Sequence, residues 1–136
     1  MPLPNLQVAR RSQILLSLLI IHCAASLLHF SHNAIYLREY PNLPAWLTSF
    51  GVWASWVGVT LVGASGYWLH RSVAPLVGLC VIAVYAVLGF GGLDHYVVAP
   101  VSAHSVAMNA TILFEVTTAA VLLVFVVGLI VRSQSR

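Results

Sequence analysis

The run LLHFSHNAIY, residues 27–36, places two histidines and an asparagine at the end of an apolar stretch that begins near residue 13. The whole stretch has about 24 residues, and a helix needs about 20 to cross the hydrocarbon core of a bilayer. An imidazole or an amide removed from water costs free energy unless it finds a hydrogen-bonding partner. The run therefore predicts a membrane-spanning helix and a polar site that other segments complete.

Composition places the rest of the chain in the same class. Of the 136 residues, 60 % are hydrophobic and 7 % are charged, and the mean hydropathy is +0.95. Such a chain cannot cover an apolar core with a polar surface, so we expect an integral membrane protein with the lipid bilayer as its surroundings. The formal charge of +3 comes from arginines beside apolar stretches, and the chain has no lysine. We therefore expect no nucleic-acid partner.

Four apolar segments predict four transmembrane helices in a single domain, residues 1–136. The segments lie at about residues 13–36, 45–69, 74–95 and 105–131. Because the links between them are short, successive helices should be antiparallel neighbours. The predicted fold is an all-α, up-down-up-down four-helix bundle.

The arginines predict the orientation of this bundle. One side of the predicted membrane holds five of them and the other holds Arg38; the five are Arg10, Arg11, Arg71, Arg132 and Arg136. Positive side chains are enriched in cytoplasmic segments, so both termini are expected to be cytoplasmic, in a bacterial-type inner membrane. The apolar pattern continues past residue 26, which argues against a cleaved signal peptide.

Helical phase aligns the polar side chains of the first segment. At 100° per residue, a stripe about 80° wide contains His22, Ser26, His29, Asn33 and Tyr36. On the last segment, Glu115 lies at a depth similar to that of His29. A carboxylate without a partner there would be costly, so we expect Glu115 to bond His29 or His22.

These residues predict a site for a metal ion or small ligand toward the non-cytoplasmic side. Imidazole and carboxylate groups suit Zn, Cu or Fe ions. The candidate ligands are His29, His32, Asp94, His95 and His104. The residues expected to support them, or to lie deeper, are His22, Asn33, Tyr36 and Glu115. Haem is a weaker alternative, because no histidine of another segment is expected at the depth of His22.

The run GFGGLDHY, residues 89–96, sets three glycines beside an Asp–His pair at the end of the third segment. Glycine lowers helix stability by about 1 kcal/mol relative to alanine, so three of them in so short a run call for a reason. The run predicts either a close approach of another element to the backbone or a frayed helix end.

Two other function classes fit the same sequence. One is an accessory subunit of a larger membrane complex of the respiratory, photosynthetic or oxygenase type, or a homo-oligomer. The second segment supports it with a face of small residues expected to pack closely on a neighbour: Gly51, Ser55, Gly58 and Ser65. The other is a small membrane enzyme that acts on a lipid-like substrate with a histidine and a carboxylate as acid and base.

Overall fold

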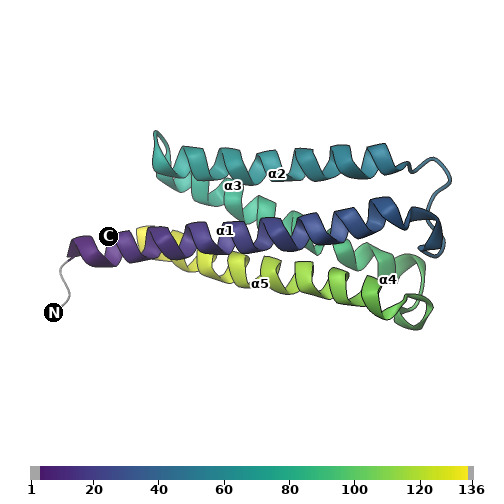
Figure 1. The fold of residues 1–136 in the computed structure, drawn as a ribbon. Coiled ribbons are helices and arrows are strands. Elements are labelled where there is room, and N and C mark those ends of the chain that lie inside the picture. Colours follow the sequence, from purple (N-terminus) through teal and green to yellow (C-terminus); the bar gives the residue numbers. More distant parts are fainter. Residues whose placement is uncertain (1–3, 135–136) are drawn as a thin grey trace.

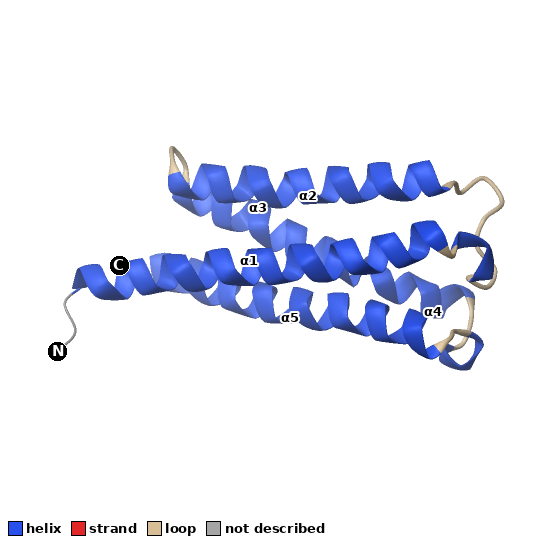
Figure 2. Ribbon diagram, in the orientation of Figure 1, coloured by secondary structure: helices blue, strands red, loops and turns tan. Residues whose placement is uncertain are grey.

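Four helical rods run alternately up and down the long axis of the structure (Figure 1). The computed structural model describes residues 4–134. In that range all the regular secondary structure is helical, and there is no strand (Figure 2). The long helices are α1 (Pro4–Ile35), α2 (Ser49–Arg71), α3 (Pro75–Leu88) and α5 (Val106–Gln134). The third rod continues past α3 as the 3-10 helix η2 (Gly89–Leu93) and the short helix α4 (Asp94–Val98). The 3-10 turns η1 (Leu37–Glu39) and η3 (Val101–Ala103) lie in the two links at one end. The predicted all-α fold is confirmed.

Local sequence signals fix the ends of α2 and α3. Thr48 precedes α2, and its hydroxyl oxygen accepts a hydrogen bond from the backbone N–H of Gly51 at 3.1 Å, as an N-cap residue does. Pro75 occupies the first turn of α3, where its missing N–H is not needed. Ser49 ties the start of α2 to the end of α1 through a 2.7 Å hydrogen bond from its hydroxyl to the carbonyl of Ala34. The helix thus begins at residue 49 and not at the predicted residue 45.

Within residues 4–134, three helices are long and apolar enough to cross a membrane. They are residues Gln7–Ile35, Pro75–Val98 and Val106–Gln134. The helix α2 has 23 residues, but glycine, serine and tryptophan dilute its apolar side chains. By length and composition it is not a further span, which corrects the four spans that the sequence predicted. The chain is a small helical protein compatible with a membrane protein.

The core at the end that holds the chain termini is apolar. Side chains from α1, α3 and α5 fill it, and each is at least 92 % buried: Leu15, Leu19, Leu79, Ile82, Tyr85, Leu122 and Val126. In water, apolar burial of this kind makes the largest favourable contribution to the free energy of helix packing. Within a membrane, close dispersion contacts between the helices stabilise the packing instead. The closely packed apolar half therefore holds α1, α3 and α5 together next to the polar half.

The helix α2 packs on α3 through a face that the sequence did not predict. Gly63 and Gly66 are buried, and a Cβ atom on Gly63 would come within 2.7 Å of the Tyr85 ring. A Cβ atom on Gly66 would come within 2.9 Å of the backbone nitrogen of Ile82. Close approach of the two helices therefore depends on these two glycines.

The predicted small-residue face of α2 lies elsewhere. Its members were Gly51, Ser55, Gly58 and Ser65. Ser55 and Ser65 are exposed, and a Cβ atom on Gly58 would meet nothing within 4 Å. Because α2 lies at the edge of the bundle (Figure 1), much of its surface faces away from the other helices, and small residues occur on both faces. Ser55, Gly58 and Ser65 thus do not pack on another helix of residues 4–134, and their expected packing on a neighbour stays a prediction.

Candidate functional site

A cluster of buried polar side chains fills the half of the bundle nearest the links η1 and η3. Its buried members come from α1, the α4–η3 region and α5: His22, Ser26, His29, His95, His104, Thr111 and Glu115. Buried polar groups in proteins are normally paired, because an unpaired group loses its bonds to water without replacement. The pairing within this cluster is therefore the first guide to its chemistry.

His29 and Glu115 form the centre of this polar cluster. Nδ1 of His29 is hydrogen bonded to Oε2 of Glu115, and each residue is 2 % exposed. The pairing of these two residues, one of two that depth and helical phase had left open, is confirmed. When Glu115 is ionised, Nδ1 of His29 donates this hydrogen bond, because a carboxylate only accepts. Nε2 of His29 then presents a lone pair on the opposite side of the ring.

Asn33 joins this pair to a second histidine. Its Nδ2 atom lies 3.2 Å from Nε2 of His29 and 3.1 Å from Nε2 of His95. An amide nitrogen has two hydrogens, so Asn33 donates one to each imidazole. Two imidazole lone pairs, one from α1 and one from α4, therefore converge on one point. The rings of His29 and His95 lie 5.4 Å apart between centroids.

Tyr40 closes the cluster on the side of the links, where the sequence had not placed it. Nδ1 of His32 and the hydroxyl group of Tyr40 are hydrogen bonded at 2.8 Å. The Tyr40 ring also lies against His95, with centroids 4.8 Å apart. Burial raises the pKa of Tyr40 to about 12, more than a hydrogen bond to Thr111 lowers it, so the phenol stays neutral at physiological pH. Among the described residues, the hydrogen-bonding partner of the His32 ring is thus Tyr40.

His104 joins the cluster from the link before α5. Its Nδ1–H donates to the carbonyl of Pro100 at 3.1 Å, and its ring lies 6.0 Å from that of His95. The other predicted members lie further out. Asp94 is exposed at the start of α4, and Tyr36 is 42 % exposed, with its ring 4.6 Å from that of His32. These two residues are therefore outside the buried part of the cluster.

His22 forms the deep end of the cluster. The Thr118 hydroxyl donates to the backbone carbonyl of Glu115 at 2.8 Å, so it accepts a hydrogen bond from Nδ1 of His22 at 3.0 Å. The ring of His22 lies against that of Tyr85, at the edge of the apolar core. Among the described residues, the polar network thus ends at His22 and reaches the surface at half-exposed His32.

The glycines of η2 make room for two of these imidazoles. A Cβ atom on Gly89 would lie 2.5 Å from Cε1 of His22, and one on Gly92 would lie 3.2 Å from Cε1 of His29. A Cβ atom on Gly91 would meet nothing within 4 Å. The glycine run therefore marks a close approach, which was one of its two predicted meanings. It was also the sequence signal that could have placed His22 and His29 against the third helix.

Several buried polar atoms of the cluster have no hydrogen-bonding partner among the described residues. They include His22 Nε2, Ser26 Oγ, Asn33 Oδ1, His95 Nδ1 and His104 Nε2. Such atoms usually face ordered water or a bound ion. Within residues 4–134, no three His, Cys, Asp or Glu side chains are grouped so that they could hold a metal ion. The cluster is thus a hydrogen-bonded network in which several buried polar atoms have no partner among the described residues.

Comparisons with known proteins add no family to this description. No protein-family model, curated protein or solved structure shows significant similarity to the chain.

Proposed function

We propose that this chain is an integral membrane protein that binds one transition-metal ion, Zn, Cu or Fe, between His29 and His95. The observation that carries the proposal is the position of Asn33 Nδ2, 3.2 and 3.1 Å from the Nε2 atoms of the two histidines. Two imidazole lone pairs from different helices converge there, and imidazole nitrogen is a common ligand of these metals. A cation would take the place of the amide hydrogens.

The contact of Glu115 with His29 supports the same proposal. Histidines that bind metals commonly donate their other ring N–H to a carboxylate, which fixes the tautomer and makes the binding nitrogen more basic. Nδ1 of His29 has this relationship to Glu115, with both residues 2 % exposed. Glu115 thus holds the lone pair of His29 toward the meeting point with His95.

Asn33 would add a third ligand to the two imidazoles. Two imidazoles that bind one ion at about 2 Å have centroids roughly 5–6 Å apart. The separation is 5.4 Å for His29 and His95. Asn33 Oδ1 is buried without a partner among the described residues and is a potential ligand. Binding requires the Asn33 amide to turn, because its Nδ2 now fills the meeting point.

The test is the metal content of the protein, purified in a mild detergent with a tag free of histidine. After incubation with Zn, Cu or Fe in turn and removal of free ions, about one ion per chain is expected for one of them by elemental analysis. His29→Ala and His95→Ala should each lose it. His70→Ala is the matched control, because His70 lies on α2 at the opposite end of the bundle, and it should keep the ion. A wild-type chain without stoichiometric metal, or full retention by the two variants, would refute the proposal.

The exposed face of α2 supports a second candidate, a subunit packed against other membrane chains or against a second copy. Among the long helices of the described part of the chain, α2 alone does not qualify as a span, and its exposed residues include Ser55, Gly58 and Ser65. Small residues let helix backbones approach closely within a membrane. If the chain is such a subunit, it should purify as a complex in mild detergent. Gly58→Leu should then dissociate this complex, and Val57→Leu, at a nearby exposed position, should leave it intact. A monomer without partners in mild detergent would exclude this role.

A further inference from the structure

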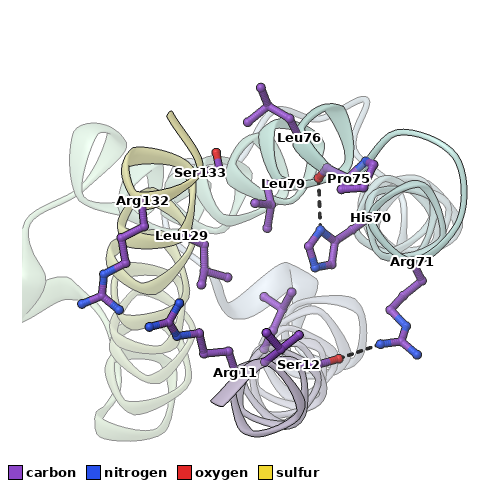
Figure 3. A pocket seen from close by; sticks show the side chains of 12 residues that line it. Arg11, Ser12, His70, Arg71, Pro75, Leu76, Leu79, Leu129, Arg132 and Ser133 are labelled. Carbon is purple, nitrogen blue, oxygen red and sulfur yellow. Dashed lines mark hydrogen bonds between the residues drawn. The ribbon is translucent and has the colours of Figure 1, made fainter. Parts of the chain in front are cut away.

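The end of the bundle opposite the polar cluster contains a pocket of about 500 Å³, shown in Figure 3. It opens where the start of α1, the link between α2 and α3 and the end of α5 come together. Ligand pockets commonly have volumes of about 300–1,000 Å³. The pocket therefore has the size of a binding site, and its lining indicates the ligand.

The pocket lining includes three arginines from three helices: Arg11 on α1, Arg71 on α2 and Arg132 on α5. In Figure 3 the guanidinium groups of Arg11 and Arg132 lie together on one side, and Arg71 extends on the other side toward Ser12. The lining contains no Asp or Glu. Arg71 donates to the hydroxyl of Ser12 at 2.9 Å. No salt bridge involving these arginines is found within residues 4–134. Within the described residues 4–134, the pocket lining thus carries three positive charges and no carboxylate, which favours an anionic ligand.

The inner wall of the pocket is apolar. Leu15 and Leu79 form its base at 0 % and 5 % exposure, and Leu76 and Leu129 lie beside them. A free inorganic anion gains nothing from such a wall. A molecule with an anionic head and a hydrocarbon chain contacts both the arginines and the leucines.

His70 adds a positioned polar group. Its Nδ1–H donates to the carbonyl of Pro75 at 3.0 Å, and Figure 3 shows the ring pointing from α2 toward the middle of the bundle. Because Nδ1 is engaged in this hydrogen bond, Nε2 is the ring nitrogen that is free to face the pocket. Nε2 can accept a hydrogen bond, for example from a headgroup hydroxyl.

We propose that this pocket binds an anionic phospholipid, with the phosphate between Arg11 and Arg132 and an acyl chain along Leu76 and Leu129. Guanidinium groups match phosphate oxygens with two parallel hydrogen bonds. The pocket also lies at the ends of the three apolar helices, which is where headgroups meet a protein embedded in a bilayer. The proposal does not depend on the metal site, which lies at the other end.

The experiment is native mass spectrometry of the detergent-solubilised chain titrated with phosphatidylglycerol or phosphatidylcholine of identical acyl chains. One phosphatidylglycerol should bind at least about tenfold more tightly than phosphatidylcholine, since each basic side chain near an anionic lipid contributes about a factor of five. Arg11→Gln with Arg132→Gln should remove that preference. Equal binding of the two lipids would overturn the proposal.

Matched variants separate the pocket from general surface charge. Arg10→Gln removes a neighbouring arginine that does not line the pocket, and Arg38→Gln removes the arginine of the other end. Both should bind phosphatidylglycerol within about twofold of wild type. A loss with Arg10→Gln as large as with the double variant would refute a defined pocket.

Two further measurements distinguish lipid from free phosphate and guard against misfolding. Leu129→Trp keeps every arginine but fills the pocket, so it should lower phosphatidylglycerol binding while circular dichroism shows unchanged helix content. Inorganic phosphate at millimolar concentration should not displace the lipid. Displacement by phosphate, or full binding by Leu129→Trp, would overturn the assignment to a phospholipid.

Discussion

Glu115 on α5 accepts a hydrogen bond from Nδ1 of His29 on α1, and each of the two residues is 2 % exposed. The contact joins the first and last helices of the chain at the centre of the polar cluster. Removing one member would leave the other buried without its partner, and such a loss costs more than the net contribution of the bond itself. The contact is therefore a point at which the stability of the bundle and the chemistry of the site can be tested together.

Glu115→Ala should destabilise the protein by about 3–5 kcal/mol, because it leaves Nδ1–H of His29 buried without an acceptor. Glu115→Gln keeps an amide oxygen in place of the carboxylate and should cost only about 1–2 kcal/mol. The measurement is unfolding in mixed detergent micelles followed by circular dichroism.

Asp94→Asn is the matched control for Glu115, because Asp94 is exposed and should tolerate the change within about 0.5 kcal/mol. The double variant His29→Ala with Glu115→Ala should be less destabilised than the sum of the two single variants. Additive effects would show that the two side chains do not act as a pair.

Gly89→Ala should destabilise the bundle by about 1–3 kcal/mol, since its Cβ atom would lie 2.5 Å from Cε1 of His22 and 2.9 Å from the side chain of Ala119. Gly91→Ala is the control two residues away. A Cβ atom there meets nothing within 4 Å, so the free energy of unfolding should change little. Thermal unfolding of the two variants in the same detergent makes the comparison.

A double variant tests whether His22 causes the effect at Gly89. His22→Ala removes the ring that the new methyl group would meet. Gly89→Ala should therefore cost less in the His22→Ala background than in the wild type. An equal cost in both backgrounds would assign the effect to the backbone of η2 or to Ala119.

The pairing of His29 with Glu115 was predictable because both residues lie inside long helices. Phase at 100° per residue and depth at 1.5 Å per residue then limit which side chains can meet. Tyr40 could not be placed in this way, because it follows the 3-10 turn η1 in a link with no regular period. Its position is set by tertiary contacts with His32 and His95.

Two other differences between prediction and structure concern the direction in which residues of one helix face. Small residues occur on more than one face of α2, so sequence alone cannot tell the face that packs on α3 from the face that is exposed. Asp94 adjoins His95 in the sequence, but neighbouring residues on a helix point about 100° apart. His95 therefore enters the cluster, and Asp94 remains outside it.

Tyr40 should make stability depend on pH in the alkaline range. Its pKa is raised from 10.0 to about 12 by burial, so the folded state holds the phenolic proton more tightly than the unfolded chain does. Stability is unaffected below pH 10 and falls as the pH rises from 10 to 12, by roughly 2–3 kcal/mol in total. Tyr40→Phe should abolish that decrease.

The absorbance of tyrosinate near 295 nm measures the same group directly. The difference between the titrations of the wild type and Tyr40→Phe should show one ionisation centred near pH 12. A midpoint near 10 would mean that Tyr40 is exposed to solvent. Tyr36→Phe serves as the control, because Tyr36 is 42 % exposed.

Gly78→Ala should be the most damaging single methyl addition at the contact between α2 and α3. A Cβ atom at Gly78 would lie 2.2 Å from the backbone nitrogen of His70 and 2.6 Å from the carbonyl oxygen of Gly66. Backbone atoms cannot turn aside as a side chain can, so the two helices must separate, at a cost of about 3 kcal/mol or more. Gly58→Ala adds the same methyl group to the open face of α2, where it meets nothing within 4 Å, and it should be neutral or slightly stabilising. Thermal unfolding of both variants in one detergent decides the matter, since equal melting temperatures would mean that α2 does not lie on α3 through its glycine face.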